Sequence, residues 1–192
     1  MGRMICSSSI SFDKPPFIIE GASIVGQKEG DGPLGKLFDV VEQDPMLGQE
    51  TWEEAESLLQ KEAIQKLLFK AGMSKEEIRY IFGGDLLGQL IATTFGILEF
   101  EVPFFGLYGA CSTMGEALSL GAVMVEAGNA DNVIAMASSH FASAERQFRF
   151  PLAYGNQRPY ASTWTVTGCG AVIISTKKGF AKITGITTGK IV

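Results

Sequence analysis

The chain has 192 residues, of which 46% are hydrophobic and 19% are charged, and its formal net charge is −5. This length suffices for one domain with a buried core, and the acidic balance argues against general nucleic-acid binding. The three cysteines lie far apart and no metal-binding spacing of cysteine and histidine occurs, so we expect neither a disulfide framework nor a structural metal site. No uncharged run has the length of a membrane-spanning helix, and the first residues lack the apolar stretch of a signal peptide.

The first quarter of the chain is expected to hold one strand and a long loop. Residues 1–15 are polar and predict a flexible N-terminus, whereas residues 16–25 are apolar and predict a buried strand that Gly26 closes. Residues 28–49 are rich in glycine, proline and aspartate and predict mostly loop, with at most one turn near residues 37–41. A loop of this length is either functional or solvated, and the sequence leaves both alternatives open.

The next segment is expected to form a long helix and the first inner strand of a sheet. Thr51 and Glu54 have the spacing of a capping box, and the helical pattern continues to Ala71, before Gly72. Ser74 and Glu77 repeat the capping signal before a strand at residues 80–84. Residues 85–95 are compatible with a helix, and a further strand is expected at residues 103–107.

A central helix is expected to follow that strand and to end at Gly128. Its first turn would carry Cys111, Ser112 and Thr113. The unpaired N–H groups and the positive end of the helix dipole favour a thiolate or a bound anion there. Cys111 is therefore interpreted as a pocket residue or a nucleophile, with a buried, inert cysteine as the alternative.

The last third predicts a buried strand at residues 132–137 that delivers His140 at its carboxyl end. Residues 141–163 are expected to be irregular, and two strands are expected at residues 164–175 and 181–191. Strands that alternate with helices indicate an α/β sheet covered on both faces. Ligands of such sheets bind beyond the carboxyl ends of the strands, where Cys111 and His140 are both expected.

The irregular segment is rich in side chains that bind carboxylates. Arg146, Arg149 and Arg158 are interspersed with aromatic residues such as Tyr154. Guanidinium groups bind carboxylates in a bidentate manner and stack on flat rings, so the segment suits a flat dianion. A solvated or interface loop is the alternative for the arginines, and a hydrogen-bonded structural role is the alternative for His140.

Several motifs resemble a known superfamily. A strand, the run GGDLLGQ, an apolar segment and GACST at a helix N-terminus resemble the thiolase and ketoacyl-synthase superfamily, in which such a run presents a nucleophilic cysteine. Within it, LYGACSTMGEALSLGA, ASSHFASAERQFRFPLAYGNQRP and TWTVTGCGA are similar to the stage V sporulation protein AD family. The resemblance covers nearly all of residues 16–192 and implies an α/β thiolase-like half-domain, a mixed sheet with helices on both faces. A second half of the layered architecture would lie outside this chain.

The resemblance implies a non-enzymatic protein that binds dipicolinic acid (pyridine-2,6-dicarboxylate) and supports its uptake, with calcium, into the developing spore. The candidate ligand-binding residues are Cys111 at the ancestral nucleophile position, Ser112, His140, Arg146, Arg149, Tyr154 and Arg158. No cofactor or protein-bound metal ion is expected. Two other functions remain open, a Cys111-dependent acyltransferase or ketoacyl-synthase-like enzyme and an interaction scaffold for membrane partners.

The same resemblance implies partners and a location. The partners are dipicolinate, alone or as its calcium chelate, the other stage V sporulation membrane proteins of the same operon, and a second copy of the chain. The homodimer would form through the strand at residues 103–107, and no nucleic acid is expected to bind. The location is the cytoplasmic side, peripheral to the forespore or spore inner membrane, in a system for transport and germination.

Overall fold

A mixed β-sheet forms the centre of the computed structural model, which describes residues 2–148, 161 and 163–189. In these residues the sheet has seven strands, ordered β4-β3-β8-β7-β5-β6, with β9 pairing β3. All but β8 and β9 run in one direction, and β8 lies antiparallel between β3 and β7. The strands are β3 (Phe17–Gly26), β4 (Val40–Glu42), β5 (Tyr80–Asp85), β6 (Phe104–Gly106), β7 (Asn132–Ser139), β8 (Gly168–Ser175) and β9 (Ala181–Lys182).

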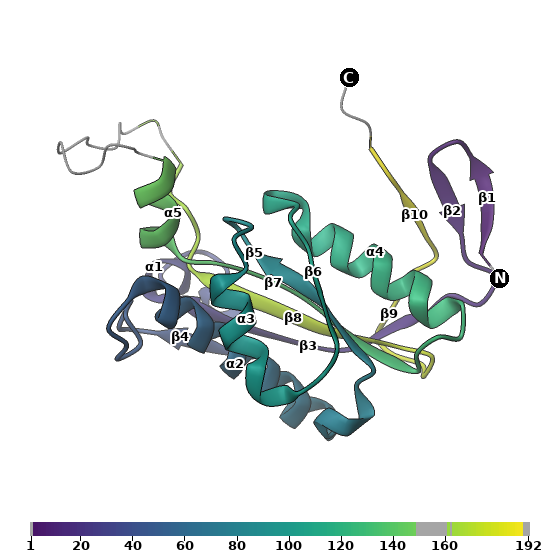
Figure 1. The fold of residues 1–192 in the computed structure, drawn as a ribbon, viewed down its shortest axis with the longest axis horizontal. Coiled ribbons are helices and arrows are strands. Elements are labelled where there is room, and N and C mark those ends of the chain that lie inside the picture. Colours follow the sequence, from purple (N-terminus) through teal and green to yellow (C-terminus); the bar gives the residue numbers. More distant parts are fainter. Residues whose placement is uncertain (1, 149–160, 162, 190–192) are drawn as a thin grey trace.

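Helices cover both faces of this sheet, as the sequence predicts (Figure 1). The helices α2 (Trp52–Ala71) and α3 (Ile91–Ile97) cover one face, and α4 (Thr113–Glu126) covers the other. Two shorter helices, α1 (Gln27–Gly30) and α5 (Phe141–Phe148), follow the carboxyl ends of β3 and β7. No helix in the described ranges combines the length and the apolarity that a membrane crossing requires.

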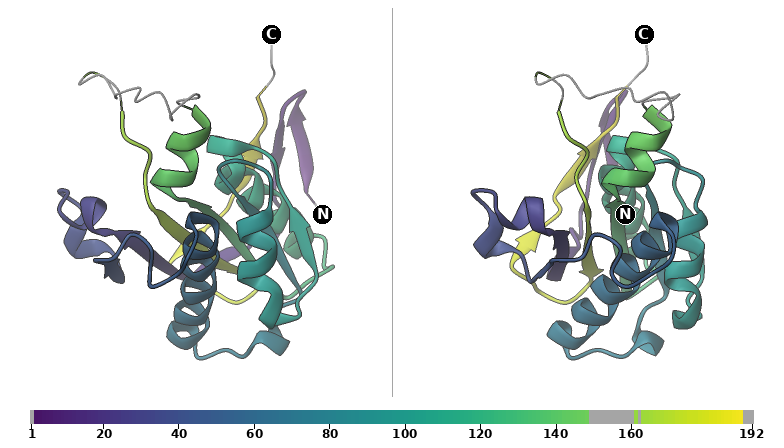
Figure 2. Two further views of the ribbon diagram at one scale, coloured as in Figure 1. Left: turned by 60° about the vertical axis from the view of Figure 1, so that its left-hand side comes forward. Right: turned by 90° about the vertical axis from the view of Figure 1, so that its left-hand side faces the viewer.

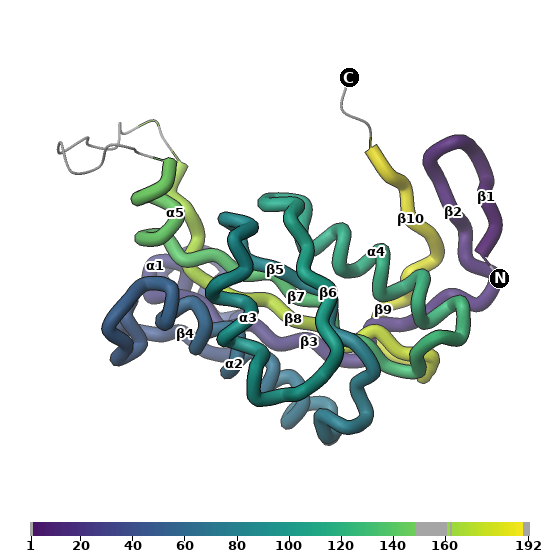
Figure 3. The backbone as a smooth tube through the Cα atoms, in the orientation of Figure 1, coloured from purple at the N-terminus to yellow at the C-terminus, as the bar shows by residue number. Residues whose placement is uncertain are grey.

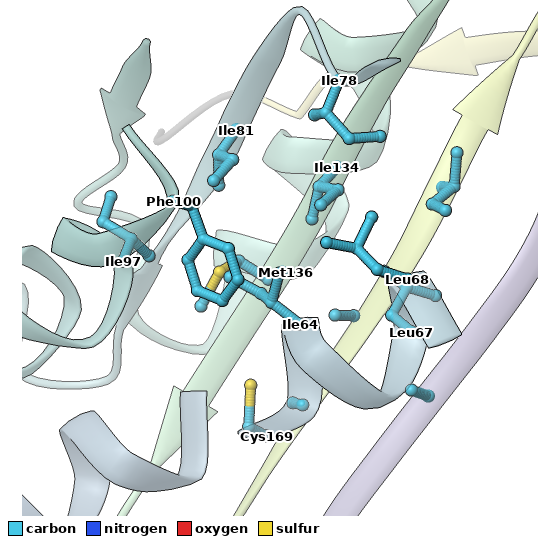
Figure 4. Close-up of a cluster of buried hydrophobic side chains, with 14 of the residues drawn as sticks. Ile64, Leu67, Leu68, Ile78, Ile81, Ile97, Phe100, Ile134, Met136 and Cys169 are labelled. Carbon is cyan, nitrogen blue, oxygen red and sulfur yellow. The ribbon is translucent and has the colours of Figure 1, made fainter. Parts of the chain in front are cut away.

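Each face of the sheet has its own apolar core. On the α2 face, Ile64 and Leu67 are fully buried against Ile81 and Ile134 of the sheet (Figure 4). Cys169 belongs to this core, and burial raises the pKa of its thiol. On the other face, α4 packs small residues such as Ala117 closely against the strands. The two cores fix the sheet between the helices, so the loops at its carboxyl edge start from defined positions.

Both ends of α2 are as predicted. The helix starts at the Thr51–Glu54 capping box, and Gly72 ends it with a φ of 62°, in the left-handed region that favours glycine. The second capping signal is also present, because the Glu77 carboxylate accepts a hydrogen bond from the Ser74 backbone N–H at 2.9 Å. The connection from α2 to β5 is therefore specified locally by the sequence.

Replacing Thr51 by alanine should lower the free energy of unfolding by about 1 kcal/mol. Thr51 Oγ1 accepts from the Glu54 N–H at 3.2 Å, and this N–H loses its partner in the variant. Urea denaturation measures the change. The control is Thr94→Ala, because Thr94 is exposed on α3 and makes no side-chain hydrogen bond within the described residues. The control should stay within about 0.5 kcal/mol of the wild type, and equal losses in both variants would contradict the capping role.

The structure corrects the expected flexible N-terminus. Residues 3–11 form a hairpin of β1 (Arg3–Cys6) and β2 (Ser9–Ser11), and β10 (Gly185–Thr187) adds a third strand to it. These strands stand beside α4 in Figure 1. Because β2 pairs with residues more than 170 positions away, no local pattern reveals the pairing.

Three other expectations about the elements are wrong. The predicted loop at residues 28–49 contains β4, which pairs in parallel with the end of β3. The segment after His140, expected to be irregular, starts with the helix α5. The two final strands are shorter than predicted, since β8 starts at Gly168 and residues 181–191 contain two short strands, β9 and β10. In each case tertiary pairing or packing overrides the local composition.

Candidate functional site

The carboxyl edge of the sheet gathers the loops that the sequence singled out. β5 lies between β6 and β7 and runs parallel to both, so the segments that follow these strands emerge at the same edge. The loop after β6 carries Cys111, and His140 directly follows β7. Figures 1 and 2 show α5 and the start of α4 at this end of the molecule. The predicted placement of both residues beyond carboxyl strand ends is confirmed.

Cys111 lies in a 3₁₀ turn (Ala110–Ser112) directly before α4, rather than in the first turn of the helix as expected. Ala110 has a φ of 48°, so the chain bends through the left-handed region before it enters the helix. The Cys111 side chain is exposed. The buried, inert alternative for this cysteine is thus wrong, and its thiol is open to small molecules.

The N-terminus of α4 already holds a negative charge of its own. Glu116 Oε1 lies 2.5 Å from Ser112 Oγ, and a Cβ atom on Gly109 would lie 2.1 Å from the same carboxylate oxygen. This carboxylate therefore sits at the positive end of the helix dipole, where acidic side chains are stabilising. A bound dicarboxylate would meet a like charge beside Ser112, which argues against the expected anion site.

His140 is fully buried, and both of its ring nitrogens have backbone partners. Nε2 lies 2.7 Å from the Pro45 carbonyl oxygen, and Nδ1 accepts a hydrogen bond from the Ala142 N–H at 3.2 Å. Burial lowers the pKa of His140, with the Pro45 carbonyl opposing that shift. The geometry corresponds to a neutral ring protonated at Nε2, which ties the loop before α2 to the start of α5. This arrangement favours the structural alternative for His140.

Behind this edge lies a chain of buried polar side chains that the sequence pattern did not predict. Ser138 Oγ donates to Glu56 Oε1 at 2.7 Å, and Gln60 Nε2 donates to Ser138 Oγ at 2.6 Å and to Thr93 Oγ1 at 3.1 Å. Thr93 Oγ1 in turn donates to Asp85 Oδ2 at 2.9 Å. Burial raises the pKa of Glu56 to about 7, against the hydrogen bond from Ser138. This network joins α2 and α3 to the carboxyl ends of β5 and β7.

Four rings form an aromatic column at the same edge, defined by Trp52, His140, Phe141 and Trp164. Successive ring centroids are 5.4, 5.2 and 5.5 Å apart, distances at which aromatic pairs attract. Lys28 Nζ lies 4.0 Å from the centroid of the last ring, Trp164, within the range of a cation–π contact. One end of the column is thus cationic.

A hollow of about 340 Å³ opens beside this cationic end. Phe141 and Trp164 line it with Lys28 from α1, and the acidic side chains Glu29 and Asp31 also face it. The volume is within the range of small-molecule sites. Sequence analysis missed Lys28 and Trp164, since the first lay in an expected loop and the second in an expected strand. Lys28 follows β3 and Trp164 precedes β8, so the two residues come together only when these strands pair.

The arginine-rich segment is placed only in part. Arg146 lies on α5 and forms an ion pair with Glu53 of α2, while its side chain remains 54% exposed. Arg149, Tyr154 and Arg158 lie outside the described residues, so their roles stay predictions. No cluster of three or more histidine, cysteine or acidic side chains suited to a metal ion occurs in the described part of the chain.

Comparisons with known proteins agree with one another. The family model for stage V sporulation protein AD matches residues 6–192. The stage V sporulation protein AD of Bacillus subtilis (strain 168) is 41% identical over 180 residues, which are 94% of this chain and 53% of that protein. The chain thus spans about half the length of this curated relative.

Solved structures of thiolase-like enzymes share the fold. The 3-oxoacyl-(acyl-carrier-protein) synthase III of Aquifex aeolicus matches with a TM-score of 0.55 at 18% identity, over 83% of this chain and 53% of that one. Xanthomonas campestris OleA with bound cerulenin matches with a TM-score of 0.54 at 15% identity, over 86% of this chain and 57% of that one. At these identities the likeness concerns the fold alone, and it confirms the predicted thiolase-like α/β class.

Proposed function

This chain belongs to the stage V sporulation protein AD family, and we propose on that basis that it is a non-catalytic, thiolase-like binding protein for dipicolinic acid. In this role it supports the uptake of dipicolinate, with calcium, into the developing bacterial spore. The observation that carries the proposal is the hollow beside Trp164 and Lys28. Its wall combines a cation with aromatic rings, two kinds of group that suit a flat, negatively charged ligand.

The chemistry of the hollow suits the calcium chelate better than the free dianion. Lys28 makes no ion pair with a described residue, so its charge is available to a carboxylate of the ligand. Glu29 and Asp31 line the same hollow and would repel a free dianion. Calcium binds carboxylate oxygens, and the chelate brings this cation close to the two acidic side chains.

The state of His140 supports a binding role over catalysis. An acyl-transfer enzyme needs a base that activates its nucleophile. His140 is the single histidine of the chain, and both of its ring nitrogens are engaged by backbone groups. Cys111 therefore has no histidine base within this chain.

An acyltransferase is the second candidate, favoured by the exposure of Cys111. The likeness to ketoacyl-synthase-like structures concerns the fold alone. Rapid acylation of Cys111 by an acyl thioester, beyond that of exposed Cys6, would support this candidate. We expect Cys111 to be modified no faster than Cys6, whose pKa is lowered by hydrogen bonds with Ser9 and Ser8.

The proposal includes the peripheral location and the assembly. The protein would act at the forespore or spore inner membrane beside membrane proteins of the same operon, as a homodimer joined through β6. β6 ends the sheet and exposes nearly half of Phe105, and exposed apolar edge strands tend to pair. Light scattering tests the dimer.

Calorimetric titration of dipicolinate, with and without calcium, tests the binding proposal. We expect saturable binding that calcium strengthens. Lys28→Ala removes a charged contact and should weaken binding by about tenfold, whereas Cys111→Ala should leave it unchanged. Lys36→Ala is the matched control, because Lys36 is exposed and does not line the hollow.

Three outcomes would count against the proposal. They are no binding by the folded wild type, loss of binding in Cys111→Ala, and equal weakening by Lys28→Ala and Lys36→Ala. The same titration on the longer Bacillus subtilis relative distinguishes a site within this half from one that both halves share.

A further inference from the structure

The charges of the chain are distributed unevenly along the sequence. All 21 acidic residues precede Arg146, and residues 146–192 contain seven basic residues and no acidic one. Such an asymmetry between the parts of a chain is typical of proteins that bind an anionic partner. The net charge of −5 conceals this basic segment.

Part of this segment forms a basic surface at the turn between β8 and β9. We define the basic turn surface as Lys14, Lys177, Lys178, Phe180 and Lys182, all of which are exposed. The Phe180 side chain is 73% exposed. Lys14 and Lys182 line one hollow beside Phe17, and Lys182 pairs with Phe17 across the sheet. Figure 3 traces this turn at the end of the sheet opposite α5, so the surface lies away from the candidate ligand site.

The fold holds the turn in place. The Phe180 N–H donates to the Ile18 carbonyl at 3.1 Å, and the Ile183 N–H donates to the Pro16 carbonyl at 2.9 Å. A Cβ atom on Gly179 would lie 2.1 Å from the Ile18 carbonyl oxygen, which shows how closely the turn approaches β3. Phe180 is therefore presented to solvent by a fixed backbone, and docking through it would not require the turn to become ordered.

The four lysines of this surface have no ion pairs within the part of the chain that the structure describes. The acidic residues on adjoining segments are Asp13, Glu126 and Asp131, and Glu126 Oε1 is shielded from solvent. An exposed aromatic ring therefore lies among lysines that have no ion pairs within the described residues. An external partner that is both anionic and partly apolar would contact all of these groups.

We propose that the basic turn surface docks on an anionic lipid membrane. The Phe180 ring would enter the boundary between headgroups and acyl chains, and the lysines would contact anionic headgroups while their stems lie along the apolar layer. An acidic protein would satisfy the lysines but gives no reason for the protruding ring, so we infer a lipid partner. The inference deepens the peripheral location of the proposed function and rests on it, but not on dipicolinate binding.

Sedimentation of the protein with lipid vesicles tests the inference. Vesicles of phosphatidylcholine alone are compared with vesicles in which about a third of the lipid is phosphatidylglycerol. We expect binding to the anionic vesicles that weakens with added salt. The double variant Lys177→Glu, Lys178→Glu should bind at least tenfold more weakly, since each lysine near an anionic surface contributes on the order of fivefold. Phe180→Ser should weaken binding by roughly tenfold, because the buried ring is lost.

Two matched variants serve as controls. Lys36→Glu reverses the charge of an exposed lysine that lies beside the exposed Leu37. Phe69→Ser removes a ring that is 82% exposed on α2. Neither should change vesicle binding. The inference is overturned if the wild type does not bind anionic vesicles or binds both vesicle types equally. It is also overturned if the control variants lose as much binding as the turn variants. Circular dichroism verifies that each variant is folded. Titration with dipicolinate tests the proposed function independently of vesicle binding.

Discussion

Gly84→Ala is expected to destabilise the protein by about 3 kcal/mol, at the upper end of the range for overpacked cores. A Cβ atom at Gly84, in β5, would lie 2.4 Å from the Leu107 carbonyl oxygen and 3.2 Å from Leu90 Cδ2. The first of these atoms belongs to the backbone, which cannot rotate away as a side chain can. Leu107 directly follows β6 and is held by a hydrogen bond from its N–H to the Gly83 carbonyl at 2.8 Å. The added methyl group must therefore displace the chain that leads to Cys111.

Gly170→Ala is the matched control, because a Cβ atom at Gly170 would have no neighbour within 4 Å although the residue also lies in a central strand. Its stability should equal or slightly exceed that of the wild type, since alanine loses less conformational entropy on folding than glycine. Urea denaturation gives both values. Comparable stabilities of the two variants would refute the close approach of β5 to the Leu107 carbonyl.

Glu56→Gln is expected to remove a loss of stability that the wild type suffers as the pH rises. The pKa of Glu56 is 4.5 when unfolded and about 7 in the buried network. Between these values the folded protein keeps a proton that the unfolded chain releases, so the free energy of unfolding falls with rising pH. The total fall in the free energy of unfolding across this pH range amounts to about 3 kcal/mol. Glutamine has no titrating proton. The free energy of unfolding of the variant, relative to that of the wild type, should therefore rise by that amount between about pH 4 and pH 8.

His140 contributes a slope of the opposite sign. Burial lowers its pKa, so its contribution to stability is present above the unfolded pKa and is lost as the pH falls through the folded pKa. In the wild type the two slopes oppose each other, and in Glu56→Gln the rise due to His140 stands alone. Urea denaturation over a pH series measures both profiles. Glu50→Gln is the control, because Glu50 is exposed, and parallel profiles of wild type and Glu56→Gln would disprove the role of Glu56.

The elements that the sequence predicts best are those whose signals are local. The capping box at Thr51 and Glu54 and the glycine after Ala71 define α2 without reference to the rest of the chain. The buried runs of β3, β5 and β7 are equally legible, because strands covered on both faces are apolar throughout. The missed elements β2 and β4 are only three residues long, and each is defined by its pairing, β2 with the distant β10 and β4 with the end of β3.

The candidate site was predictable in its position but not in its chemistry. The carboxyl-edge rule placed Cys111 and His140 correctly, since it depends only on strand order and direction. It does not specify hydrogen bonds, so neither the commitment of both His140 nitrogens to backbone groups nor the carboxylate of Glu116 beside Ser112 followed from the sequence. The pairing of Lys28 with Trp164 likewise depends on the tertiary fold, because these residues are 136 positions apart.

The aromatic column also determines which part of the protein its intrinsic tryptophan fluorescence reports on. The chain contains two tryptophans, and both belong to the column, Trp52 beside His140 and Trp164 beneath Lys28. Intrinsic emission excited at the tryptophan band therefore originates from one end of the sheet, and the turn between β8 and β9 contributes none of it. A change in emission intensity or wavelength on adding a small molecule reports on the carboxyl edge without any label.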